Sequence, residues 1–198
     1  MSRTPNARKH DTHERIVGVA ARAIRRQGYA GVGVADVMKD AGLTHGGFYA
    51  HFGSRDALLV EALERAGRES GEALAHAVER RKAKGASAFR ALVDAYLSTE
   101  HLASIETGCP VAALACDMPR QPDAVRDASA VPVRRLVATV RSALPPASRA
   151  AAGVVAGTLV GTLQLARAMG DDAEGRALLS AARKALIHQY DTPGAPAG

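Results

Sequence analysis

Residues 32–56 constrain the fold most, because they hold two short helical patterns on either side of a glycine turn. The first pattern carries an apolar face at helical spacing, formed by Val34, Val37, Met38 and Ala41. Gly42 follows this face, and glycine readily adopts the left-handed backbone conformation that a tight turn between helices needs. This layout is typical of a helix-turn-helix, whose second helix is built to enter a DNA groove.

The second pattern is expected to begin at His45, with the Thr44 hydroxyl as its N-cap. Phe48 and Phe52 are four residues apart and share the inward face. The residues expected to lie largely outside this face are His45, Gly46, Tyr49 and His51. Gly46 and Gly47 each cost a helix about 1 kcal/mol relative to alanine, so local stability does not explain them. Close approach of this segment to a DNA backbone would explain the two glycines.

The N-terminal part of the chain carries most of the positive charge. Residues 1–55 contain nine Lys+Arg and four Asp+Glu, a net charge of +5 out of the total of +6, together with four of the seven histidines. A polyanion is expected to bind at this end, with an affinity that falls steeply as salt rises. The alternative is that arginines such as Arg15 and Arg22 are only solvating charges on helical surfaces.

The stretch Ala41 to Leu58, AGLTHGGFYAHFGSRDAL, resembles the DNA-binding motif of the tetracycline-repressor (TetR) family of transcription regulators. The resemblance extends over roughly the first 60 residues. It implies an all-helical homodimeric repressor with a small DNA-binding domain and a larger domain that binds a small effector. Gly33 departs from the family pattern, because many members have a serine or threonine there that caps the helix and contacts phosphate.

The resemblance also implies roles for individual residues. It places Thr44, His45 and Gly46 near the bases, Tyr49 and His51 on phosphates, and Arg55 on the DNA backbone. The full set predicted to contact DNA is Lys39, Thr44, His45, Gly46, Gly47, Tyr49, His51 and Arg55.

The rest of the chain favours an all-α fold, since no hairpin signal appears and helical periodicity returns in almost every window. The predicted organisation is a disordered basic arm (1–10), a helix-turn-helix domain (11–54), a helical effector-binding and dimerisation domain (55–190) and a disordered tail (191–198). The N-terminal sequence does not resemble a secretion leader, which predicts a cytoplasmic protein. No cofactor, metal site or catalytic residue is expected.

Turn and capping residues predict the helix bounds. The first expected helix starts near Asp11 or Thr12 and ends at Gly28, and a long helix follows Ser54 and runs from Arg55 to about Lys82. Another helix starts at Ser87, a further one has Pro110 in its first turn, and the next starts near Asp123 with a break or kink at Pro132. The last two helices are expected over 147–169 and from Ala173 to Tyr190.

Apolar residues of the second domain predict an effector pocket formed by Phe89, Leu92, Tyr96, Cys109 and Leu114. Cys109 and Cys116 are too far apart on a helix for a disulfide and make a poor zinc site. Two interpretations of Cys109 stay open: a small buried side chain, or a sensor of oxidants or electrophiles.

Gly153, Gly157 and Gly161 form a small-residue series that lets another helix approach closely, and Leu165 continues the same face. By resemblance, the last two helices pair with their mates in a four-helix bundle, so these residues are the predicted dimer interface. Two heads would then meet a palindromic operator at half-sites about 34 Å apart, or a multiple of that. A membrane span is disfavoured, because threonines, Gln164 and many alanines dilute the apolar stretch.

Two rival functions compete with that of a DNA-binding regulator. One is a helical enzyme that uses Cys109 with His101 or Asp117, although no spacing fixes contact between them. The other is a helical scaffold or ligand-binding dimer whose head no longer binds DNA. Specific, salt-sensitive DNA binding distinguishes the regulator from both. Repression is the predicted outcome, and activation depends on where the operator lies relative to a promoter.

Overall fold

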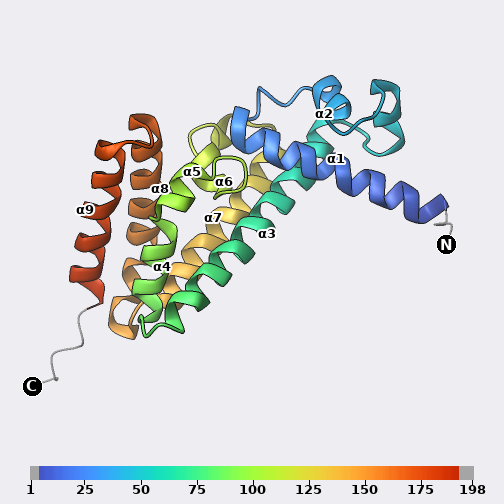
Figure 1. The fold of residues 1–198 in the computed structure, drawn as a ribbon. Helices are drawn as coiled ribbons and strands as arrows, with labels where there is room; N and C mark the ends of the chain where they lie inside the picture. The colour runs from blue at the N-terminus through green and yellow to red at the C-terminus, as the bar shows by residue number, and fades with distance from the viewer. Residues whose placement is uncertain (1–4, 192–198) are drawn as a thin grey trace, which may run out of the picture. The chain divides into compact units, whose positions relative to one another are not determined.

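The computed structural model describes residues 5–191, which form α-helices and 3-10 helices without a strand (Figure 1). The all-α prediction is confirmed. The helices are α1 (Pro5–Gln27), α2 (Val34–Asp40), η1 (His45–Ala50), α3 (Arg55–Lys82), α4 (Ala88–Tyr96), α5 (Thr99–Ala103), α6 (Pro110–Leu114), η2 (Met118–Arg120), α7 (Asp123–Ala143), η3 (Pro146–Ala151), α8 (Ala152–Met169) and α9 (Ala173–Tyr190).

The first helix begins earlier than the sequence pattern predicts. It starts at Pro5, so residues 5–10 are helical and not part of a disordered arm. Proline suits the first helical position, and alanine, arginine and lysine propagate the helix. Asp191, assigned to the tail, instead follows α9 and accepts a hydrogen bond from Arg90 Nε at 3.0 Å. The rest of the predicted arm and tail lies outside the described residues.

Most other helix ends follow the predicted turn chemistry. Gly28 ends α1 with a φ of +73°, and its N–H donates to Ile24 O. Ser54 accepts a hydrogen bond from Ala57 N at 3.1 Å, and Ser87 accepts one from Arg90 N at 3.0 Å. Helices α3 and α9 have the predicted bounds. Pro132 lies inside a continuous α7.

The chain divides into two compact units. The N-terminal unit comprises Met1–Glu69 and Glu106–Pro132, and the C-terminal unit comprises Ser70–Ile105 and Val133–Gly198. Helices α3 and α7 each continue from one unit into the other. These packing units do not end at residue 54, since residues 55–69 and 106–132 pack with the helix-turn-helix.

The core of the N-terminal unit joins segments distant in sequence. Helix α1 packs against α2 and α6. The Tyr29 hydroxyl lies 2.6 Å from Ser129 Oγ, which donates to Val125 O at 2.7 Å, and both hydroxyls are buried. Tyr29 is therefore the donor to Ser129. Burial raises the pKa of Tyr29 above its ordinary value, so the phenol stays protonated.

The order of donors predicts unequal effects of removing the two hydroxyls. Tyr29→Phe is expected to lower the free energy of unfolding by about 1 kcal/mol, because Ser129 keeps its acceptor. Ser129→Ala is expected to cost more, about 1–3 kcal/mol, because a buried phenol then lacks an acceptor. Urea denaturation followed by circular dichroism measures both values. Equal losses, or a larger loss in Tyr29→Phe, would contradict this assignment of donor and acceptor.

In the C-terminal unit, α8 runs beside α9, α4 packs against α9, and α5 packs against α8 (Figure 1). Gly170 ends α8 with a φ of +112°, a conformation that favours glycine. Gly175, in the first turn of α9, faces the end of α8. A Cβ atom at this position would lie 2.9 Å from Ala166 O and still closer to Gly170 O. The corner between α8 and α9 therefore has no room for a side chain at 175.

Candidate nucleic-acid interface

The turn between α2 and η1 has the backbone that the sequence predicts. Gly42 has a φ of +69°, and its N–H donates to Lys39 O at 2.9 Å. The next N–H, of Leu43, donates to Met38 O at 2.8 Å. These two hydrogen bonds satisfy carbonyls at the end of α2 and reverse the chain toward η1.

The element after the turn is a 3-10 helix, where the sequence pattern predicts an α-helix capped by Thr44. Thr44 is extended, and its side chain makes no capping hydrogen bond; its carbonyl accepts one from Gly47 N at 3.1 Å. The paired glycines explain the difference, because they disfavour the α-helix and the segment is only six residues long.

Five of the predicted DNA-binding residues are exposed on or beside this turn: Lys39, Thr44, His45, Gly46 and Tyr49. We call them the reading surface. Tyr49 is 70% exposed although it is aromatic. A Cβ atom added at Gly46 would meet no atom within 4 Å, so protein packing does not require glycine there. Gly47 is half-buried, and a Cβ there would make only ordinary contact with Met38.

Phe48 and Phe52 hold this surface in place from behind. They are 1% and 3% exposed, and their ring centroids are 5.4 Å apart in a stacked arrangement. The ring of Tyr49 meets Phe48 edge-on at 5.2 Å. The predicted inward face is confirmed, and Tyr49 extends outward from a rigid aromatic base.

His51 is half-buried, whereas helical spacing predicts that it points outward. Its ring centroid lies 5.8 Å from that of His13, and its buried Nδ1 has no hydrogen-bond partner among the described residues. Burial, with nearby His13 and Lys9, lowers the pKa of His51 below its ordinary value. The helical spacing failed here because the segment does not have the α-helical period.

Arg55 has a role that the sequence did not indicate. Its Nε donates to Val32 O at 2.9 Å, and its Nη2 donates to Tyr29 O. Two of its donors therefore tie the start of α3 to the loop between α1 and α2. Contact between Arg55 and the DNA backbone remains a prediction.

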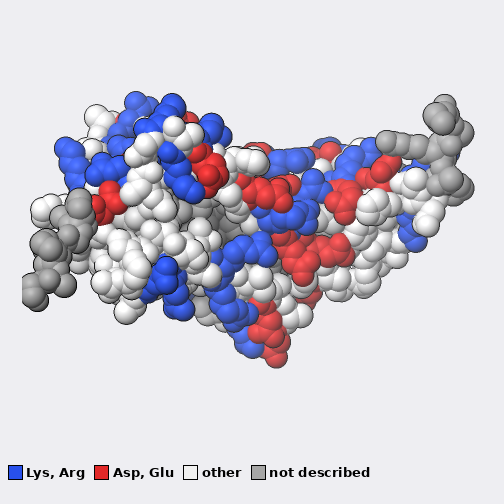
Figure 2. Space-filling model, turned by 90° about the horizontal axis from the view of Figure 1, so that it is seen from below, with Lys and Arg blue, Asp and Glu red and all other residues white. Residues whose placement is uncertain are grey.

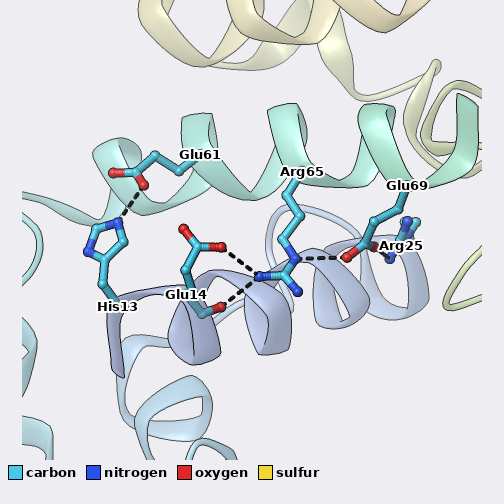
Figure 3. A network of polar contacts seen from close by, with 6 residues as sticks. All are labelled: His13, Glu14, Arg25, Glu61, Arg65 and Glu69. Carbon is cyan, nitrogen blue, oxygen red and sulfur yellow. Dashed lines mark hydrogen bonds and ion pairs between the residues drawn. The ribbon is translucent and has the colours of Figure 1, made fainter. Parts of the chain in front are cut away.

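A network of ion pairs between α1 and α3 was not predicted from the sequence either (Figure 3). Arg65 bridges Glu14, at 3.2 Å, and Glu69, at 2.7 Å, and Glu69 accepts a further hydrogen bond from Arg25 at 3.0 Å. Arg25 is buried, and this burial lowers its pKa. Desolvation raises the pKa of Glu69, but hydrogen bonds from Arg65 and Arg25 outweigh it and the net shift is downward. Within this network, only the pair of Arg65 and Glu69 has the i, i+4 spacing from which an ion pair on one helix can be predicted.

The positive charge of residues 1–55 is largely balanced once the acidic residues that pack in the same unit are counted. The N-terminal unit holds 13 Lys+Arg and 12 Asp+Glu, whereas the C-terminal unit holds 13 and 8. Part of the positive charge of the N-terminal unit is neutralised by ion pairs, such as that of Arg26 with Glu106 at 2.8 Å. Basic and acidic side chains are interspersed over much of the face in Figure 2. Local arrangement around the turn therefore carries more of the case for DNA than net charge.

The predicted effector residues are all buried, but they do not belong to one unit. Phe89, Leu92 and Tyr96 line one face of α4 in the C-terminal unit, whereas Cys109 and Leu114 belong to the N-terminal unit. No disulfide joins Cys109 to Cys116. Within the described residues, no group of acidic, histidine and cysteine side chains could hold a metal ion.

A polar group lies at the end of the same α4 face. His101 Nδ1 contacts Tyr96 O at 2.7 Å, and the two rings meet edge-on at 4.8 Å. Burial is the main cause that lowers the pKa of His101 to about 4, so the ring is neutral at physiological pH. Arg167 of α8 donates to His101 O at 2.8 Å and to Ser104 O at 3.2 Å. These contacts join α4, α5 and α8.

The predicted dimer residues lie on α8. Gly153 and Gly157 are exposed, Gly161 is half-buried, and a Cβ on any of the three would have no atom within 4 Å. Leu165 is 61% exposed, as is the neighbouring Val154 at 69%. By length and composition alone, Pro146–Met169 could cross a membrane, and 44% of its most apolar window is buried in the protein. Core helices of globular proteins share these properties.

The helices and the turn define a class: an all-helical DNA-binding regulator of the helix-turn-helix type. The profile of "Bacterial regulatory proteins, tetR family" matches residues 16–62, and that of "Tetracyclin repressor-like, C-terminal domain" matches residues 85–182. The chain belongs to the TetR family of transcriptional regulators. Members of this family are transcriptional regulators and not enzymes, in agreement with the sequence-based prediction.

Curated relatives match over part of their length. An HTH-type transcriptional regulator of Mycobacterium tuberculosis is 32% identical over 119 residues, which is 60% of this chain and 59% of the relative. The HTH-type transcriptional repressor NemR of Escherichia coli is 33% identical over 57 residues, 29% of each chain. The chain therefore spans less than two thirds of the length of these relatives.

Solved structures share the fold over nearly the whole chain. The reduced form of E. coli NemR has a TM-score of 0.77 and 19% identity, covering 94% of this chain and 100% of NemR. A TetR regulator from Chloroflexus aurantiacus has a TM-score of 0.73 and 23% identity, covering 92% and 97%. At these identities the similarity shows the fold alone.

Proposed function

We propose that the chain is a cytoplasmic, homodimeric repressor that binds a palindromic operator and releases it when a small hydrophobic effector binds. The observation that carries the proposal is the reading surface: an exposed turn with an outward tyrosine and an unpacked glycine, held by two buried phenylalanines. A groove-binding element needs side chains that are free to meet bases and phosphates on a base that does not move. Repression as the outcome is supported by the name of the relative NemR.

Within this proposal, Thr44, His45 and Gly46 approach the bases, and Tyr49 holds a phosphate. Gly46 and Gly47 let the DNA backbone come close, which accounts for glycines that protein packing does not require. Lys39 adds a positive charge at the edge of the surface. Phosphate contacts position the protein on any sequence, whereas base contacts select one.

Self-association is proposed through α8 and α9, with Gly153, Gly157, Gly161 and Leu165 at the contact. Small residues allow close helix approach, and exposed apolar side chains of α8, such as Val154 and Leu165, would lose contact with water. A twofold dimer presents two identical heads, so its operator is expected to be a palindrome.

The effector is proposed to bind beside the buried α4 face of Phe89, Leu92 and Tyr96. A ligand can lower operator affinity only if it prefers the dimer conformation that does not match the half-sites. Decisive release needs a preference of about 5.5 kcal/mol between the two conformations. Thermal-shift screening of hydrophobic metabolites and antimicrobials, followed by DNA release, would identify the compound. A reporter gene placed behind the operator tests whether the chain represses or activates.

The proposed contacts predict different defects for two neighbouring substitutions. Tyr49→Phe is expected to weaken binding about equally across DNA sequences, because it removes a phosphate contact. His45→Ala is expected to change base preference at one position of each half-site. Fluorescence anisotropy with duplexes selected by the protein from a random pool, at two salt concentrations, measures both effects. Gly71→Ala on α3 is the control, since this glycine has open space around it and is not one of the predicted DNA-binding residues. Unchanged affinity and preference in both variants would overturn the assigned roles.

A further inference from the structure

One arginine joins the two ends of the segment that carries the reading surface. Arg55 is the first residue of α3, directly after the helix-turn-helix, and its Nε donates to Val32 O at 2.9 Å. Its Nη2 donates to Tyr29 O in the same loop. We call these two hydrogen bonds the Arg55 bridge. Residues 33–54, which contain α2, the turn and η1, are therefore closed into a loop whose entry and exit meet at one guanidinium.

Local helix stability does not explain an arginine at this position. A cation in the first turn of a helix is disfavoured by the positive end of the helix dipole. The entry to α2 also lacks an anchor of its own, because its N-cap is Gly33 and makes no side-chain hydrogen bond. The start of α2 is instead held from α3, by a residue 23 positions beyond Val32 in the chain.

The loop that Arg55 binds is itself fixed in the core of the N-terminal unit. Tyr29 and Val32 are 3% and 1% exposed, and the Tyr29 hydroxyl bonds to Ser129 of α7. Two buried side chains therefore hold the two carbonyls in place. Because these acceptors cannot rotate away as a side chain can, the guanidinium fixes the start of α3 relative to the start of α2.

We propose that Arg55 is a positioning residue for DNA binding, which orients the reading surface through the Arg55 bridge and does not hold a phosphate. The proposal rests on the proposed function, because it takes the reading surface as the part that meets DNA. A planar guanidinium donates to two carbonyls in a fixed geometry, which the ammonium group of lysine cannot reproduce. Without the bridge, the reading surface has the binding geometry for only a fraction of the time, and the apparent affinity falls by that fraction.

The test compares Arg55→Lys with Arg55→Met by fluorescence anisotropy, over a series of salt concentrations, on a duplex that the protein selects from a random-sequence pool. Both variants are expected to lose affinity by about tenfold for each protomer, because both lose the paired hydrogen bonds. The slope of log affinity against log salt is expected to stay that of the wild type, because no phosphate contact is lost. Arg68→Met is the matched control: Arg68 is exposed on the same helix, and the variant removes the same charge.

A phosphate contact by Arg55 predicts the opposite pattern. Arg55→Lys would then keep most of the affinity, because lysine also binds phosphate, and Arg55→Met would lower the salt slope by about 0.9 for each protomer. Either result would overturn the positioning role. If the wild type selects and binds no duplex at any salt concentration, the proposed function fails instead.

A second measurement is made without DNA. The carbon-13 resonances of the Tyr29 and Val32 carbonyls report their hydrogen bonds, and both are expected to shift in Arg55→Lys and Arg55→Met but not in Arg68→Met. Circular dichroism at the assay temperature checks that each variant is folded, so that a loss of affinity is not a loss of folded protein. Carbonyl resonances that stay unchanged would show that the Arg55 bridge does not form in solution, which also overturns the proposal.

Discussion

Phe48→Ala is expected to lower the free energy of unfolding by about 3–5 kcal/mol, the largest stability loss that we expect from a single substitution in the helix-turn-helix. Phe48 is 1% exposed, contacts Phe52 and Tyr49 through its ring, and lies under the surface that we propose meets DNA. Its removal leaves a cavity beside the rings of Phe52 and Tyr49. The chain has no tryptophan, so urea denaturation is best followed by far-UV circular dichroism.

Tyr49→Ala provides the matched comparison at the next position. Because Tyr49 is mostly exposed, this variant is expected to lose less than about 1 kcal/mol. Both variants are expected to lose DNA affinity, but only Phe48→Ala should also lose amide-exchange protection in residues 34–52. Phe48→Ala with wild-type stability would show that the aromatic pair does not support the reading surface.

Gly157→Leu is expected to separate folding from self-association. A Cβ at this position meets no atom within 4 Å, so the protomer has room for a side chain. Leucine also favours the helix by up to about 1 kcal/mol relative to glycine, so the isolated protomer should be slightly more stable. If α8 pairs closely with its mate, however, the leucine side chain blocks that approach. Sedimentation should then show monomers, and operator affinity should fall by about 100-fold or more, because the second head no longer binds as part of one molecule.

Gly71→Leu controls for the chemistry of the change. Gly71 also lies in a helix with open space around it, but on α3, which is not part of the proposed dimer contact. It is expected to leave both the dimer and operator affinity unchanged. A dimer that persists in Gly157→Leu would remove α8 from the proposed interface.

The sequence predicted those parts of the structure that local chemistry determines. Glycines with positive φ mark the end of α1 and the turn after α2, and Ser54 and Ser87 cap the helices that they precede. Helix α9 has the bounds that the sequence predicts. In each case the decisive interaction spans no more than about four residues, which is the range that a sequence pattern reports.

The failures concern contacts between distant residues and one short helix. Nothing local indicates that Tyr29 donates to Ser129, or that Arg55 bonds to the carbonyl of Val32. The orientation of His51 was wrong because α-helical spacing was applied to a 3-10 segment, in which the turn is tighter. For the candidate site, the reading surface and the buried pair Phe48 and Phe52 behind it could be predicted from the motif. The ion pairs between α1 and α3 could not, because they join residues distant in sequence.

The corner between α8 and α9 also limits how this protein can evolve. Any residue larger than glycine at 175 collides with main-chain oxygens, which cannot rotate away as a side chain can. Homologous sequences can vary at many surface positions of these two helices. They must keep glycine at position 175, however, or adopt a different backbone at the bend between α8 and α9.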